Sequence, residues 1–272
     1  MVGWEQKGAV APTPALSYSL WRLRGVLCKV AVPGYSRATI PECDMARLAR
    51  LFCPDTPHLV QLALRPASEP VAVPALDAWA AGLVQTWQAQ RLAVHGWVLT
   101  PTEILMLATP PSADALRATV QVLGRVLARL RGGGPVFAGR YHSTVVEPGA
   151  WVLPSLIWLE NLPVRQGLAS ESEYWRWSSA RAHTGFDVVS PVQMHPDYWR
   201  CGNTPFDRQA NYRRRLHEGL PAADAATVVA ALQGQWALGS PEFAARVEQQ
   251  GGRRATPRPR GRPRRSGANG AA

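Results

Sequence analysis

Short apolar stretches alternate with Pro, Gly and polar breaks through the middle of the chain. Where β-branched and apolar residues lie between turn residues, the pattern predicts strands at 58–64, 94–99, 103–108 and 137–146. Where apolar residues recur at spacings of three and four, it predicts helices at 75–91 and 113–131. The resulting order, β-α-β-β-α-β, is that of the ferredoxin-like split βαβ arrangement.

The predicted fold class is therefore α+β, an antiparallel sheet with helices on one face. We assign this ferredoxin-fold domain to residues 45–186. Residues 1–44 are rich in Pro, Gly and Ala and are interpreted as an N-terminal extension, and both Met1 and Met45 are candidate start sites. A small helical appendage is predicted at 187–250, and a disordered basic tail at 251–272.

Capping residues and prolines predict further helices outside this central pattern. In the appendage, one helix is predicted from near Asp224 to Gly239. Another is predicted after Ser240, with Pro241 at its first position. Near residue 157 a further helix is expected, and Pro154 should kink or delay its start. In the helix at 113–131, the face with Arg117, Arg125, Arg129 and Arg131 is interpreted as solvated.

A hairpin phrase, Trp97-Val-Leu-Thr-Pro-Thr-Glu103-Ile-Leu105-Met-Leu-Ala-Thr-Pro110, lies at the centre of this pattern. It resembles the REP-associated tyrosine transposases, a branch of the single-tyrosine transposases of the HUH superfamily. Further phrases match that family: Gly139-Arg140-Tyr141, Pro163-Val164-Arg165, Trp177-Ser178-Ser179 and Gly261-Arg262-Pro263-Arg264. The resemblance covers about 45–265 and independently implies the ferredoxin-like fold.

The resemblance implies an enzyme that cuts and rejoins single-stranded DNA beside hairpins, with Mg²⁺ or Mn²⁺ as cofactor. In the family, two histidines two residues apart hold the metal, and a tyrosine attacks phosphorus. The matched positions in this chain are Glu103, Leu105 and Trp158. One carboxylate beside a Leu is a poor divalent-metal site, and an indole has no hydroxyl to attack with. No intact catalytic residue, no metal site and no cofactor are therefore predicted.

Three readings of this loss are open. The first is a DNA-binding protein, a degenerate transposase that binds without cleavage. The second is an active strand-transfer enzyme with a relocated site, in which Tyr141 is the nucleophile and Glu103 and His142 lie near a metal. The third is the product of a decaying transposase gene.

Aromatic and Arg side chains together can stack unpaired bases and hold phosphates. In the folded part of the chain, this predicts DNA contacts by Arg140, Tyr141, Arg165, Trp175 and Trp177. In the tail, the segment around Arg260-Gly-Arg262-Pro resembles an AT-hook, in which arginines lie in a narrow minor groove. The predicted DNA contacts of the tail are Arg258, Arg260, Arg262, Arg264 and Arg265.

Composition agrees with a nucleic-acid partner. The formal net charge is +11, and seven of the 30 basic residues lie in 251–272, which contains no acid. The four cysteines form no metal-ligand spacing, and neither a signal peptide nor a membrane span is predicted. We therefore expect a cytoplasmic, nucleoid-associated protein that is a monomer or a homodimer. Its expected partner is single-stranded or hairpin DNA.

Deleting 251–272 should weaken all DNA binding about equally, because phosphate contacts carry little sequence information. If about five arginines contact phosphates, the plot of log affinity against log salt concentration should have a slope that is more negative by roughly 4 to 5 with the tail than without it. Fluorescence anisotropy at several salt concentrations measures both quantities. Equal affinity and equal slope for the full and truncated chains would contradict a role for the tail in DNA binding.

Overall fold

The computed structural model describes residues 49–66, 73–188 and 190–257. The predicted extension at 1–44, the candidate start Met45 and the tail from Arg258 onward lie outside the described residues. Within them, no helix is long and apolar enough to cross a membrane.

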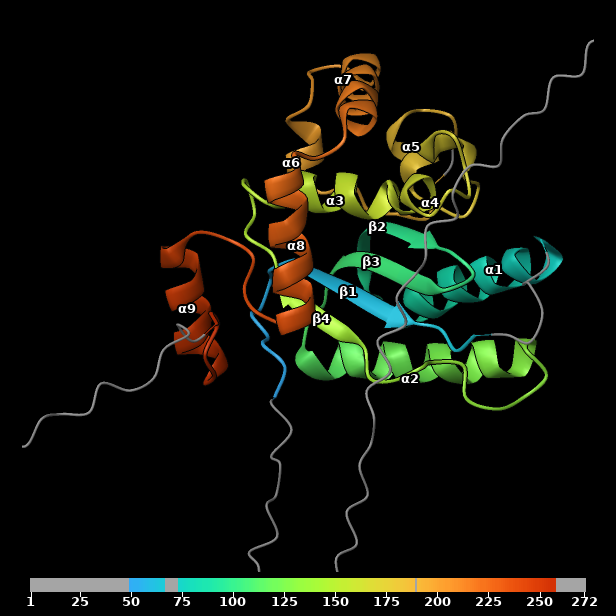
Figure 1. Ribbon diagram of the computed structural model, residues 1–272, viewed down its shortest axis with the longest axis horizontal. Helices are drawn as coiled ribbons and strands as arrows, with labels where there is room; N and C mark the ends of the chain where they lie inside the picture. Colours follow the sequence, from blue (N-terminus) through green and yellow to red (C-terminus); the bar gives the residue numbers. More distant parts are fainter. Residues whose placement is uncertain (1–48, 67–72, 189, 258–272) are drawn as a thin grey trace, which may run out of the picture. The chain divides into compact units, whose positions relative to one another are not determined.

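A four-stranded antiparallel sheet forms the centre of the protein (Figure 1). Its strands are β1 His58–Ala63, β2 Ala93–Leu99, β3 Glu103–Thr109 and β4 His142–Val145, in the order β2-β3-β1-β4. In the β1–β3 register, Gln61 lies opposite Leu105 and Ala63 opposite Glu103. The element order and this antiparallel sheet confirm the predicted α+β, ferredoxin-like fold.

One face of the sheet is covered by α1 Val73–Ala89 and α2 Ala113–Leu130 (Figure 1). Both helices point their apolar residues inward, at the predicted spacings of three and four. Ser112 caps α2, because its side chain accepts a hydrogen bond from the Ala115 N–H at 3.0 Å. The buried residues of these helices form one core with strand residues that include Val60, Ile104 and Met106.

The prediction that helices cover only one face is wrong. The other face carries α3 Val152–Glu160, over which the chain packs further helices. Leu59, Leu105 and Leu107 point to this side, because residues two apart on a strand share a face. The elements that follow α3 are α4 Leu162–Arg165, η1 Ser172–Tyr174, α5 Ala180–His183, α6 Pro196–Trp199, α7 Pro205–Glu218, α8 Ala222–Gly234 and α9 Pro241–Gly251.

Helices occupy much of 196–250, and α6, α7 and α8 pack against α3 in the hydrophobic cluster that α3 shares with the sheet, so they are not a separate appendage. The described residues all fall within one compact unit. The start of the predicted tail is also part of the fold: Ala255 is fully buried, and its carbonyl accepts from the Ala237 N–H at 2.9 Å. The guanidinium of Arg253 donates to the carbonyl of Gln235.

Several predicted element boundaries shift. The fourth strand begins at His142 instead of residue 137, because the chain bends at Ala138 and Gly139. The helix predicted to end at Gly239 ends at Gly234, after which Gln235 takes a left-handed conformation. Pro154 does not delay α3, because it lies in the first turn, where its missing N–H is not needed. Ser240 and Pro241 begin α9 as predicted.

The Trp177-Ser178-Ser179 phrase has a structural role at the edge of the sheet. Leu99 donates its N–H to the Trp177 carbonyl, and Ser179 donates its N–H to the Trp97 carbonyl, both at 2.9 Å. Ser178 thereby forms an isolated antiparallel bridge with Val98. This segment pairs with the outer edge of β2. Without it, the backbone N–H and C=O groups along that edge strand would be unpaired.

Gly96 allows α3 to approach β2 closely. A Cβ atom at this position would overlap the Cδ2 atom of Leu156, and it would lie 3.3 Å from the Ser179 Oγ. Gly96 is buried in the strand, next to a shift in register after Val94. A side chain here would therefore push apart α3 and the sheet.

The Gly96→Ala variant should lose about 1–3 kcal/mol of unfolding free energy, because the added methyl group overpacks the β2–α3 contact. Gly139→Ala is the matched control, since a Cβ added there would meet no atom within 4 Å. Urea denaturation measures both variants. Equal stability of the two would contradict this account of the helix–sheet contact.

Candidate functional site

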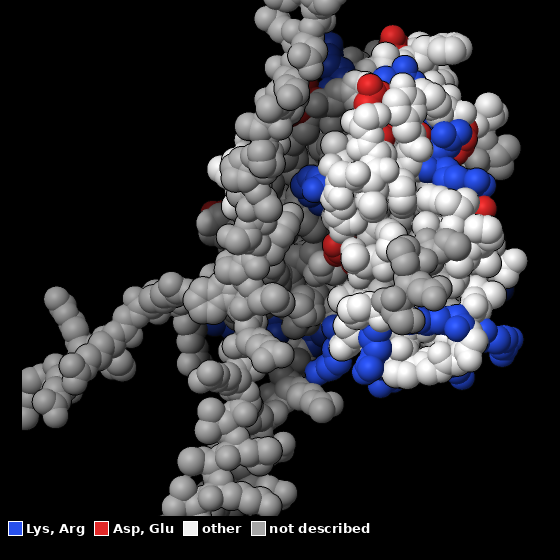
Figure 2. Space-filling view, turned by 45° about the vertical axis from the view of Figure 1, so that its right-hand side comes forward, with Lys and Arg blue, Asp and Glu red and all other residues white. Residues whose placement is uncertain are grey.

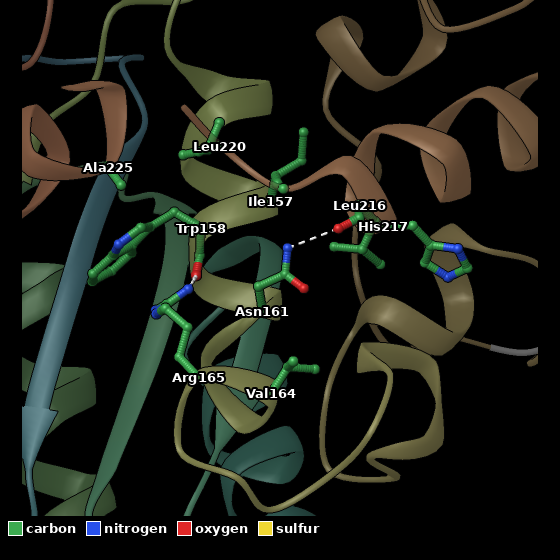
Figure 3. Close-up of a pocket in the computed structure, with 10 residues that line it drawn as sticks. Ile157, Trp158, Asn161, Val164, Arg165, Leu216, His217, Leu220 and Ala225 are labelled. Atoms are coloured by element: carbon green, nitrogen blue, oxygen red, sulfur yellow. Dashed lines mark hydrogen bonds between the residues drawn. The ribbon is translucent and has the colours of Figure 1, made fainter. Parts of the chain in front are cut away.

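A pocket of about 280 Å³ lies beside α3, between α4 and the segment that joins α7 to α8 (Figure 3). Trp158 and Arg165 lie on one side of it, and His217 lies on the other. Asn161, at the end of α3, donates its side-chain N–H to the Leu216 carbonyl at 2.9 Å and so ties the two sides together. The residues that line the pocket are Ile157, Trp158, Asn161, Val164, Arg165, Leu216, His217, Gly219, Leu220 and Ala225.

Trp158 and Arg165 form an aromatic–guanidinium pair in this pocket. The Cζ atom of Arg165 lies 4.8 Å from the centre of the indole ring, and its Nη1 donates to the Trp158 carbonyl at 2.5 Å. Protein atoms crowd the guanidinium and lower its pKa, while the nearby Glu103 carboxylate opposes that shift. Arginine stays charged at neutral pH, so the pocket offers a flat ring beside a fixed positive charge.

Glu103 lies at the start of β3, and its carboxylate is held by two side-chain amides. Gln61 donates to one carboxylate oxygen at 2.6 Å, and Gln166 donates to the other at 3.1 Å. Leu105 points to the same face and is fully buried. The two positions matched to the family's histidines are thus side by side on a central strand. One is a hydrogen-bonded carboxylate and the other is core.

Leu105 and Trp158 belong to the same hydrophobic cluster under α3. The position matched to the nucleophile therefore lies on the same face of the sheet as the positions matched to the metal ligands. Trp158 is buried and contributes packing as well as the pocket wall. The positions at which the resemblance implies a catalytic centre are thus part of an apolar cluster.

The residues of the relocated site do not come together. Tyr141 packs into the core on the α1 and α2 side, where the Arg50 guanidinium lies 3.6 Å from the centre of its ring. Burial raises the pKa of its hydroxyl, which disfavours the nucleophilic phenolate. Glu103 points to the α3 side, and His142 pairs in register with Gln61 on that same side. The sheet therefore separates Tyr141 from both residues.

The other predicted DNA contacts differ in exposure. Arg140 and Arg165 are exposed, whereas Trp177 is buried and donates its indole N–H to Asp77 at 2.8 Å. Trp175 is partly buried and donates its N–H to the Leu99 carbonyl at 2.8 Å. Trp177 and Tyr141 are thus core residues, and their burial does not favour direct contact with DNA. The predicted tail contacts lie outside the described residues: Arg258, Arg260, Arg262, Arg264 and Arg265.

The arginines of α2 form a solvated face, as the sequence pattern indicated, but Arg131, just after α2, is partly buried and donates to the carbonyls of Arg65 and Pro66 at 3.2 and 3.1 Å. Arg117, Arg125 and Arg129 are exposed, and Arg117 pairs with Asp114 at 2.8 Å. Figure 2 shows Lys and Arg side chains gathered along the lower edge of the molecule, at the level of α2. This basic surface lies on the face of the sheet opposite the pocket.

Among the described residues, Glu171, Glu173 and His217 are the only group arranged closely enough to hold a metal ion. His217 Nε2 and the Glu173 Oε1 atom lie 2.7 Å apart, as in a hydrogen bond. The Arg213 guanidinium lies 3.9 Å from that same oxygen. His217 and Arg213 thus both lie against one oxygen of Glu173, in a side-chain network that ties α7 to η1.

Sequence reasoning missed Glu160, which is fully buried at the end of α3. One oxygen accepts from the Ser179 hydroxyl and from His183 Nδ1, and the other accepts from the Tyr212 hydroxyl at 2.7 Å. The only sequence signal is an acidic residue within an apolar helical run. The network joins α3 to β2 through Ser179, to α5 and to α7, and it thereby holds the walls of the pocket.

Comparison with known proteins gives a distant likeness. No family model matches the chain, and no curated protein sequence matches it. Among solved structures, it is similar to a REP-associated tyrosine transposase bound to a REP hairpin, with a TM-score of 0.47 and 10% sequence identity. The superposition covers 56% of this chain and 93% of that chain. This likeness is too distant to assign a family or an activity.

Replacing Glu160 with Ala should cost about 3–5 kcal/mol of unfolding free energy, because it leaves three buried donors without their acceptor. Glu218→Ala is the control, since that carboxylate is exposed at the end of α7. Chemical denaturation followed by tryptophan fluorescence measures the difference. A cost no larger than that of Glu218→Ala would show that the network does not hold α3, α5 and α7 in place.

Proposed function

We propose that this protein binds single-stranded or hairpin DNA, in the manner of a transposase-like protein, without cleaving it. The observation that carries the proposal is the pairing of Trp158 with Arg165 in the pocket beside α3. None of the residues that line this pocket has a hydroxyl or thiol group. The pocket therefore supplies binding groups without the nucleophiles that strand transfer uses.

The binding chemistry follows from the two side chains. The exposed Arg165 guanidinium can donate to phosphate oxygens, and the buried Trp158 indole beside it holds the guanidinium in position. Arg165 is kept in place by its bond to the Trp158 carbonyl, so little of its motion is lost when a ligand binds. The excess of basic residues adds a general attraction for the DNA backbone.

The proposal that the protein does not cleave DNA is supported by two residues of strand β3. Phosphodiester cleavage of this type needs a metal that polarises the phosphate. Glu103 has both oxygens engaged by Gln61 and Gln166, and Leu105 offers no ligand. A second proposal, an enzyme that uses Tyr141, finds no support in the geometry, because the sheet separates that residue from Glu103.

Binding should depend on Arg165 more than on an equally charged residue elsewhere. With a labelled DNA hairpin that carries a single-stranded end, Arg165→Ala should weaken binding about ten-fold, since it removes a charged contact to phosphate. Arg125→Ala removes the same charge from the opposite face and should change affinity much less. Anisotropy titrations compare the two variants, and equal losses would place the binding surface elsewhere.

The same DNA tests for cleavage. Incubation with Mn²⁺ should produce neither nicked strands nor a covalent protein–DNA adduct on denaturing gels. An adduct would overturn the proposal, and peptide mapping would identify the nucleophile. Normal folding together with no affinity for any DNA would instead favour the product of a decaying gene.

A further inference from the structure

Two large aromatic side chains lie exposed on the surface made by α6 and α7. Trp199 is 49% exposed at the end of α6, and Phe206 is 82% exposed in the first turn of α7. Both line a hollow of about 450 Å³ that is separate from the pocket beside α3. Exposed aromatics grouped around a hollow are unusual in a folded domain and mark interaction surfaces.

The hollow has a rigid floor. Tyr198, next to Trp199, is buried and donates its hydroxyl to the His183 carbonyl at 2.8 Å. Tyr198 also packs against the rings of His183 and Tyr212, which belong to the network around Glu160. Because Tyr198 faces inward, the adjacent Trp199 is held outward. The exposure of Trp199 is therefore a consequence of packing and is not due to a loose chain.

A guanidinium is held against the indole. The Arg208 Cζ atom lies 4.4 Å from the centre of the Trp199 ring. Its Nη1 donates to the carbonyls of Gly202 and Asn203 at 3.1 and 3.3 Å, which keeps the side chain in this position. The surface thus repeats the combination of Trp158 and Arg165, but on a more exposed platform.

The charge around the hollow favours an anionic partner. Helix α7 carries Arg208, Arg213, Arg214 and Arg215 against Asp207 and Glu218. Of the residues that line the hollow, Asp187 is the acidic one, and it is already paired with Arg181 at 2.9 Å; Asp207, next to Phe206, accepts from the Thr204 hydroxyl at 2.6 Å. An apolar peptide or a second copy of this basic chain would gain nothing from this charge.

We propose that this surface, defined by Trp199, Phe206 and Arg208, is a second DNA subsite that stacks an unpaired base of single-stranded DNA. Aromatic rings accept a base of any sequence, and the neighbouring arginines bind the phosphates on either side of it. This inference rests on the proposed function and deepens it. It assigns the single-stranded part of the DNA to α6 and α7.

The test uses the full chain and two labelled probes, an oligothymidine and an abasic strand of the same length. Both carry the same phosphates, but only the first has bases to stack. The wild-type protein should prefer oligothymidine. Replacing Trp199 and Phe206 together with Ala should weaken oligothymidine binding about ten-fold or more and remove the preference over the abasic strand.

Leu130→Ala is the matched control, because Leu130 is an exposed apolar residue on α2, on the other side of the sheet. It should leave both affinities unchanged. Circular dichroism and thermal melting check that the double variant is folded. Trp199→Phe, which keeps a stacking ring, should recover most of the affinity that the double variant loses.

Three results would overturn the subsite. The double variant could bind oligothymidine as the wild type does, or it could lose affinity for both probes equally. It could also turn a dimeric wild type into a monomer without a change in DNA affinity, which would make the surface a self-association site. If Arg165→Ala still weakens hairpin binding in these cases, the proposed function stands and only this subsite fails.

Discussion

The buried carboxylate of Glu160 is the constraint on which the second face of this protein depends. A carboxylate without water is costly unless hydrogen bonds satisfy its oxygens, and here Ser179, His183 and Tyr212 do so. Ser179 and His183 lie at the two ends of α5, and Tyr212 lies on α7. Satisfying one charge therefore determines where α5 and α7 lie relative to α3 and β2. The pocket beside α3 and the floor under Trp199 are both lined by residues of these helices.

The sheet divides the protein into two faces with different roles. The face under α1 and α2 is a conventional apolar core, covered outside by solvated arginines. The face under α3 contains the positions that the transposase resemblance links with chemistry. Leu105 and Trp158 belong to one apolar cluster, which fills the space between strand and helix. Apolar side chains at these two positions are thus part of a well-packed core.

Helix α7 connects the two aromatic–guanidinium pairs. Arg208, near its start, lies over Trp199, while Leu216 and His217, near its end, line the pocket that contains Trp158 and Arg165. At 1.5 Å per residue, the two ends of this stretch are about 12 Å apart along the helix. Tyr212, between them, is buried on Glu160. One inward-facing tyrosine therefore orients a helix whose two ends contribute to separate surfaces.

Local sequence was sufficient for the order of strands and helices in the sheet domain and for the caps at Ser112 and Ser240. These features depend on neighbours within a few residues, through periodicity and capping. Only the tertiary structure decided which aromatics are core. Trp177 finds its acceptor at Asp77, and Tyr141 turns away from Glu103, because distant segments bury them. The role of Glu160 was equally hidden, since its three donors are separated from it by 19 to 52 residues.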